Sequence, residues 1–153
     1  MNNEYHYWDS THLGQKMELK IYGDKGTPFV VFPSLAGRFY DFEDYGMINA
    51  VQEFIEAGLV QLYTVDSVDN QSWVNWSIPP AQRALRHEDY DLYITNEVVP
   101  FIRKRVGKKA KPFTTGCSMG GFHAGNFFFR HPDIFSGMIS LSGLFQTDRF
   151  VGD

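Results

Sequence analysis

Four short apolar runs in the middle and end of the chain show no regular alternation of apolar and polar residues. Strands that are covered on both faces have this pattern, because neither face meets water. We therefore predict that these runs form buried strands of one mainly parallel sheet. The runs are PFVVFP at 28–33, LVQLYTVD at 59–66, PFTTGCS at 112–118 and GMISLSG at 137–143.

Residues 4–22 have a different pattern. EYHYW at 4–8 and MELKIY at 17–22 alternate or are rich in β-forming residues, and the turn residues DSTHLG lie between them. Two such runs around a turn are typical of a hairpin. We predict an antiparallel hairpin at one edge of the sheet.

Three stretches between the apolar runs predict helices. INAVQEFIEAG at 48–58 has apolar residues at helical spacing and ends on a glycine. HEDYDLYITNEVVPFIRKRVG at 87–107 has acids in its first turn and cations in its last, and Pro100 is expected to kink it. MGGFHAGNFFFRH at 119–131 stops before a proline. Strands that alternate with helices predict an α/β fold, a mostly parallel central sheet with helices on both faces.

Composition and charge narrow the classes of partner. The 153 residues are 43% hydrophobic, enough for one domain with a core, and their formal net charge of −4 argues against binding to nucleic acid or to an anionic membrane. No run approaches the roughly 18 apolar residues that span a bilayer, and the first residues lack a signal-peptide pattern. Cys117, the single cysteine, cannot form an internal disulfide, and no Cys/His cluster has zinc spacing. We expect a cytoplasmic protein without a metal or cofactor.

The sequence Gly116-Cys117-Ser118-Met119-Gly120 fits the G-x-S-x-G nucleophile elbow, in which a serine sits on a sharp turn between a strand and a helix. A strand is predicted before this motif and a helix after it. The helix would offer unpaired N–H groups to a developing oxyanion. The alternative is an ordinary glycine-rich turn. The Cys117 thiol does not fit as nucleophile, because a frame centred on it lacks the glycines, and we expect it to pack in the core.

A second oxyanion donor would come from the loop that follows an earlier strand. Residues 30–42 occupy that place, and the Leu35 amide, just past the strand end, is our candidate; the alternative is a plain surface loop. Trp73 and Trp76 lie in a polar stretch after another strand, which suggests an apolar acyl or aryl pocket. Core or edge packing would explain these two tryptophans equally well.

Four stretches together resemble the esterase branch of the α/β-hydrolases, which contains esterase D-like, feruloyl-esterase-like and antigen 85-like acyl enzymes. They are FPSLAGRFYDFEDYGM, YTVDSVDNQSW, TTGCSMGGFHAGNFFFRHPDIF and SLSGLF, and the resemblance covers nearly the whole chain. It implies hydrolysis of a small-molecule carboxylic ester through an acyl-enzyme. The residues that it implies are Ser118 as nucleophile, the amides of Leu35 and Met119 as oxyanion hole, and Ser34, Ser72 and Trp73 at the substrate pocket.

The chain departs from this family in its histidines. The family's triad runs in the order Ser, Asp or Glu, His, but the only histidines after Ser118 are His123 and His131, which the helix carries away from the serine. The three earlier histidines, at 6, 12 and 87, are expected at the surface or at caps. Asp148 follows the last predicted strand and would be the acid only in a variant arrangement. We therefore expect the triad acid and histidine, with two further strands, to lie outside this sequence.

The missing triad residues affect the expected activity and association of the chain, and two functions other than ester hydrolysis are also considered. The 153-residue chain is expected to be nearly inactive by itself, and an open apolar sheet edge would favour aggregation or pairing with another chain, as in a homo-oligomer. A non-catalytic binding or assembly module that keeps the elbow for its fold is the alternative function. Nucleic-acid binding by RKRVGKKAK at 103–111 is a third hypothesis, although a solvated helix end explains these cations.

Overall fold

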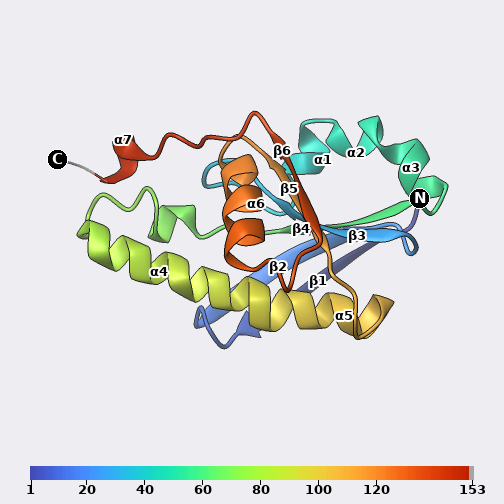
Figure 1. Ribbon diagram of the computed structural model, residues 1–153, viewed down its shortest axis with the longest axis horizontal. Helices are drawn as coiled ribbons and strands as arrows, with labels where there is room; N and C mark the ends of the chain where they lie inside the picture. Colours follow the sequence, from blue (N-terminus) through green and yellow to red (C-terminus); the bar gives the residue numbers. More distant parts are fainter. Residues whose placement is uncertain (152–153) are drawn as a thin grey trace.

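The computed structural model describes residues 1–151, which form a six-stranded sheet with the strand order β1-β2-β4-β3-β5-β6 (Figure 1). The last four strands along the chain are mutually parallel, β3 against β4 and β5, and β5 against β6. This confirms the predicted α/β fold. The strands are β1 (Asn3–Ser10), β2 (Gln15–Tyr22), β3 (Thr27–Phe32), β4 (Val60–Val65), β5 (Phe113–Cys117) and β6 (Gly137–Leu141).

The predicted hairpin is present at the edge of the sheet. β1 and β2 pair antiparallel from Asn3 opposite Tyr22 to Ser10 opposite Gln15, and β2 pairs antiparallel with β4. β1 alternates between exposed and half-buried residues, because it is an edge strand with one face towards water.

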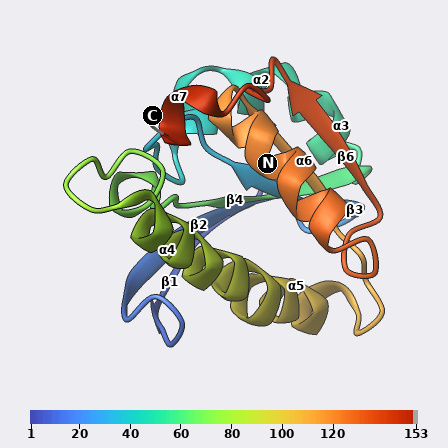
Figure 2. The ribbon, with the colours of Figure 1, turned by 60° about the vertical axis from the view of Figure 1, so that its left-hand side comes forward.

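Helices cover both faces of the sheet (Figures 1 and 2). Neighbouring residues of β3 show the two faces: Val30 packs in a large core cluster with residues of α4, α5 and α6, whereas Val31 packs in a smaller one with Phe42 and Ile48. Side chains of a strand alternate between faces, so one strand supports both cores. The helices are α1 (Asp41–Asp44), α2 (Met47–Ala50), α3 (Gln52–Glu56), α4 (Pro80–Tyr93), α5 (Val99–Val106), α6 (Met119–Arg130) and α7 (Asp148–Val151), with a 3-10 turn η1 (Asp69–Gln71) and a π-helical segment η2 (Ile94–Val98).

Two predicted helices differ from the structure. The stretch 48–58 is not one helix but parts of the short α2 and α3, because Val51, with φ −110° and ψ 9°, interrupts the helical backbone. The helix predicted from residue 87 begins seven residues earlier, at Pro80, where proline suits the first helical position because its missing N–H needs no partner there.

The predicted disturbance at Pro100 takes the form of the π-helical segment η2. The Val99 amide donates to the carbonyl of Ile94, five residues earlier, and Pro100 follows without an N–H of its own. The helical chain nevertheless continues from Pro80 to Val106. Within residues 1–151, no helix has the length and apolar character that crossing a membrane requires.

Candidate active site

Ser118 lies on a sharp turn between β5 and α6. Its backbone has φ 57° and ψ −118°, a conformation that costs a residue with a side chain on the order of 1–3 kcal/mol. Three backbone hydrogen bonds hold it there: the Ser118 N–H donates to the Leu141 carbonyl at 2.9 Å, and the Ser118 carbonyl accepts from Phe122 and Leu144, both at 3.1 Å. The predicted sequence of strand, turn and helix around Ser118 is confirmed.

The glycines beside Ser118 allow α6 to lie against β3. A Cβ atom on Gly120 would be 2.4 Å from the Phe32 carbonyl oxygen, and one on Gly116 would be 2.6 Å from the same oxygen. Both contacts are with backbone atoms, which cannot swing away. Only glycine therefore fits at these two positions.

The loop after β3 forms a turn from Ser34 to Gly37. The Gly37 N–H donates to the Ser34 carbonyl at 2.9 Å, and Ala36 has φ +56°, as in a type II turn. Within residues 1–151, no hydrogen bond engages the Leu35 amide or the Met119 amide at the start of α6. Both N–H groups are thus free to act as donors to another molecule.

Asp69 and His123 form a buried pair that connects this loop to α6. Both side chains are buried, and His123 Nε2 lies 2.9 Å from Asp69 Oδ1. Asp69 Oδ2 accepts from the Ala36 N–H at 2.9 Å. Burial by itself would raise the pKa of Asp69, but the charge and hydrogen bond of His123 and the bond from Ala36 outweigh it, so the pKa is lowered. Asp69 is therefore a carboxylate with two donors.

His87 requires a correction, because it lies in the interior and not at the surface or a cap. It is 6% exposed, and its ring stacks on that of His123 with centroids 5.6 Å apart. Its Nδ1 accepts from Trp73 Nε1 at 3.2 Å, and its Nε2 faces the Asn126 amide at 3.3 Å. Burial, and after it the proximity of His123, lowers the pKa of His87 to about 3. His87 is therefore uncharged at neutral pH.

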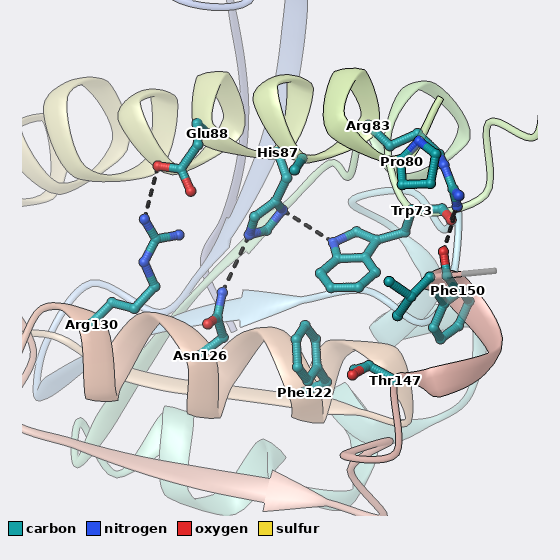
Figure 3. Close-up of a pocket in the computed structure, with 12 residues that line it drawn as sticks. Trp73, Pro80, Arg83, His87, Glu88, Phe122, Asn126, Arg130, Thr147 and Phe150 are labelled. Carbon is teal, nitrogen blue, oxygen red and sulfur yellow. Dashed lines mark hydrogen bonds and ion pairs between the residues drawn. The ribbon is translucent and has the colours of Figure 1, made fainter. Parts of the chain in front are cut away.

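A pocket of about 320 Å³ lies between α4, α6 and the segment that contains α7 (Figure 3). Trp73 stands in it with the edges of Phe122 and Phe150 at centroid distances of 5.1 and 5.7 Å, and the Phe122 amide is bonded to the Ser118 carbonyl. Three aromatic side chains therefore meet in one part of the pocket, which suits an apolar or aryl group, whereas charged side chains line other parts of it. The lining residues are Trp73, Pro80, Arg83, Ala84, His87, Glu88, Phe122, Asn126, Arg130, Thr147, Phe150 and Val151.

Two other predicted pocket residues lie elsewhere. Ser72 is fully buried, and its hydroxyl donates to the Val68 carbonyl at 3.0 Å. Ser34 belongs to the turn after β3, where its carbonyl is occupied. Trp76 is 60% exposed and stacks on Phe150 at the outside of the pocket. Of the two tryptophans, only Trp73 lines the pocket.

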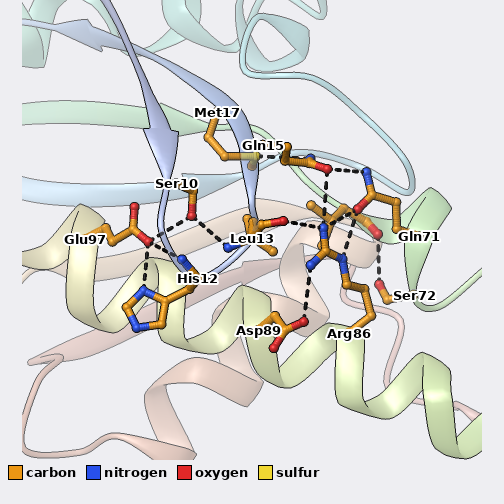
Figure 4. Close-up of polar contacts among 11 residues, drawn as sticks. Ser10, His12, Leu13, Gln15, Met17, Gln71, Ser72, Arg86, Asp89 and Glu97 are labelled. Atoms are coloured by element: carbon orange, nitrogen blue, oxygen red, sulfur yellow. Dashed lines mark hydrogen bonds and ion pairs between the residues drawn. The ribbon is translucent and has the colours of Figure 1, made fainter.

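Side-chain hydrogen bonds also connect the segment after β4 with the turn of the β1–β2 hairpin (Figure 4). Arg86 of α4 donates to the Gln71 side chain at 2.7 Å and to the Leu13 carbonyl at 2.9 Å, so it joins this segment to the hairpin turn. His12 lies in that turn with Nδ1 2.8 Å from Glu97, and His6 lies beside Glu4 on β1. These two partly exposed histidines fit the expected surface roles.

The thiol and the basic segment that the sequence suggested as possible sites belong neither to the Asp69–His123 pair nor to the pocket. Cys117 is half-buried beside the smaller core, and burial raises the pKa of its thiol. Arg103 donates to the Ala110 carbonyl and Arg105 to Glu4 of β1, so two cations of the basic segment at the end of α5 have partners within the chain. Among the described residues, no hydrogen bond reaches the Ser118 hydroxyl, and no group of three His, Cys, Asp or Glu could hold a metal.

Known structures share this fold. A ferulic acid esterase superposes with a TM-score of 0.72 at 18% identity over 94% of this chain and 59% of its own, and the S-formylglutathione hydrolase of Staphylococcus aureus with 0.72 at 17% over 97% and 62%. The enterobactin esterase of Shigella flexneri gives 0.62 at 19% over 94% and 37%. At these identities the likeness shows the fold. The chain spans about three fifths of the first two proteins.

No curated protein sequence matches the chain. The model of one protein family, described as "Putative esterase", matches residues 10–149, which include the loop after β3, Asp69 and the Ser118 turn. The match covers most of the sequence, and the fold is that of the α/β-hydrolases. The chain belongs to this esterase family.

Proposed function

We propose that this chain carries the nucleophile and the oxyanion hole of a serine esterase. Ser118 Oγ would attack the carbonyl carbon of a carboxylic ester while a general base takes its proton. The carbonyl oxygen would become an oxyanion that accepts from the Leu35 and Met119 amides. The alcohol would leave with the proton, and water would then hydrolyse the acyl-enzyme. The strained backbone of Ser118, held between β5 and α6, is the observation that carries this proposal.

The general base in this proposal is a histidine outside the sequence described here. His123 and His131 each have Nε2 directed at a buried carboxylate, Asp69 and Asp91 respectively. His87 has partners at both ring nitrogens. A hydroxyl without a base within hydrogen-bond reach stays protonated at neutral pH. We therefore expect the 153-residue chain to be orders of magnitude slower than a protein with a complete triad.

The first test is Ser118→Ala, assayed by fluorophosphonate labelling and by hydrolysis of p-nitrophenyl acetate. In the complete protein, by which we mean this chain together with the proposed general base, both signals are expected to disappear. The loss should be about 10⁴-fold or more, because the nucleophile is gone. Cys117→Ala is the matched control, since it removes the neighbouring thiol and should keep both signals. Unchanged labelling of Ser118→Ala would refute the proposal, and an unreactive complete protein would favour the non-catalytic alternative.

We also propose that the aromatic pocket receives the apolar or aryl part of the ester. Trp73→Ala removes the central wall of the pocket, so KM for an aryl ester is expected to rise by about 10-fold. Hydrolysis of p-nitrophenyl acetate, compared with longer acyl and aryl esters, would measure the effect. Trp76→Ala is the control, because Trp76 lies outside the pocket. Equal effects of both variants on every substrate would argue against this use of the pocket.

A further inference from the structure

The turn that contains Leu35 holds a residue in an unfavourable backbone conformation. Ala36 has φ +56°, where a residue with a Cβ atom is disfavoured by roughly 1–2 kcal/mol. If the peptide between Leu35 and Ala36 rotated, the turn would change from type II towards type I, in which both central residues have negative φ. Something must therefore hold this peptide in place.

The Asp69 carboxylate makes the contact that can do so. Its Oδ2 accepts from the Ala36 N–H, which belongs to the peptide that would rotate. Other contacts hold the residues that follow: the Ser67 hydroxyl donates to the Gly37 carbonyl at 2.9 Å, and Asp66 accepts from the Phe39 amide at 3.0 Å. Among the described residues, only Asp69 reaches the central peptide of the turn.

His123 in turn fixes the Asp69 carboxylate. It lies five residues after Ser118, is fully buried, and has the rings of Phe32 and Phe122 at 5.8 and 5.7 Å. Its Nδ1 has no partner among the described residues, so Nε2 provides its one polar anchor, the bond to Asp69 Oδ1. The position of His123 is set by the same helix that begins at Ser118.

We propose that Asp69 and His123 are positioning residues that set the oxyanion loop relative to the nucleophile. The two oxygens of one carboxylate connect the loop after β3 with the helix after β5, so that the turn that carries the Leu35 amide stays fixed relative to α6, which begins directly after Ser118. The inference rests on the proposed function, because it assigns the Leu35 amide to the oxyanion hole. Neither residue needs to touch the substrate.

A second pair in the molecule supplies a matched control. Asp91 of α4 is also buried, and its Oδ1 lies 2.8 Å from Nε2 of His131, at the other end of α6. Its partners are His131 and Arg130, and neither belongs to the loop after β3. Asp69→Asn and Asp91→Asn therefore remove the same charge from the same kind of pair, and only the first loosens the turn.

The experiment measures kcat and KM for p-nitrophenyl acetate in the complete protein. Asp69→Asn is expected to lower kcat by about 10- to 100-fold with KM changed less than about 2-fold, because a displaced oxyanion donor acts in the transition state. His123→Gln, which keeps a donor, should give a smaller loss. Asp91→Asn should leave kcat unchanged. Hydrogen exchange of the Ala36 amide should accelerate in Asp69→Asn and stay constant in Asp91→Asn, whether or not the protein is active.

A second substitution that restores kcat would distinguish a positioning role of Asp69 from a role in stability alone. Glycine adopts positive φ without the steric penalty, so adding Ala36→Gly to Asp69→Asn should recover part of kcat. The inference is overturned if Asp69→Asn and Asp91→Asn lower kcat equally, or if Ala36 exchange is the same in both. If Asp69→Asn does not fold, the same comparison of His123→Gln with His131→Gln decides the matter. Activity that survives Ser118→Ala would refute the proposed function instead.

Discussion

The two carboxylate–histidine pairs on α6 have the same chemistry but different connections. Asp69–His123 joins segments that follow two different strands and is closed to water, with 2% and 0% of the two side chains exposed. Asp91–His131 joins α4 to the far end of α6, and a quarter of its histidine side chain is exposed. The second oxygen of Asp69 accepts from a loop amide, whereas Asp91 also meets Arg130 at 3.2 Å. The partner of the second oxygen therefore decides whether such a pair orders a loop or fastens two helices.

The largest difference is expected when each aspartate is replaced by alanine. Asp69→Ala leaves the fully buried His123 imidazole without its partner and removes the acceptor of the Ala36 amide, so it should destabilise the protein by about 3–5 kcal/mol. Asp91→Ala should destabilise it by only about 1–2 kcal/mol, because His131 and Arg130 can be hydrated. Urea unfolding of both variants would measure this. Equal losses would mean that water reaches the Asp69 site.

Lowering the pH is expected to reduce the stability of the folded protein through His87, whose ring stacks on that of His123 in the first pair. Its pKa is about 3 in the folded protein and near 6.5 when unfolded, so the unfolded chain binds the proton more strongly between these values. This contribution to stability is complete above pH 6.5 and declines as pH falls towards 3, by about 3 kcal/mol at pH 4. The lowered pKa of Asp69 acts in the same direction at lower pH, below its unfolded value.

His87→Gln identifies the group responsible for the pH dependence. Glutamine can occupy both hydrogen bonds but binds no proton, so the unfolding free energy of this variant should vary much less between pH 6.5 and 4 than that of the wild type. Urea unfolding at several pH values measures both slopes. An unchanged slope in His87→Gln would contradict the role of this histidine.

The smallest effect is expected at the rim of the second pair. Glu88 accepts from Arg130 at 2.8 Å, but half of its side chain is exposed, and such surface ion pairs contribute about 0–1 kcal/mol. Glu88→Gln should therefore change the unfolding free energy by less than about 0.5 kcal/mol, because Arg130 keeps Asp91. The urea midpoint gives this value directly. A loss as large as that of Asp91→Ala would show that Glu88 belongs to the buried pair.

Local patterns predicted most of the fold. All four apolar runs are strands, with bounds that differ by at most two residues, because burial on both faces leaves a signal within each run. The glycines around Ser118 marked the turn, since their backbone contacts exclude a side chain. The helix at 48–58 was predicted wrongly, because its apolar spacing persists through Val51 while the backbone breaks there. The early start of α4 was missed although Pro79-Pro80 is a recognisable helix beginning.

The sequence by itself determined where the strands lie along the chain, the turn at Ser118 and the resemblance to an esterase fold, because the patterns that identify them lie within short stretches of neighbouring residues. Only the tertiary structure decided that Asp69 meets His123, 54 positions away, and Ala36, 33 positions away. The physical reason is the strand order β4-β3-β5, in which parallel strands end at the same edge of the sheet and bring their following segments together. The burial of His87 has the same origin, since it depends on how α4 packs against α6 and not on the residues beside it in the chain.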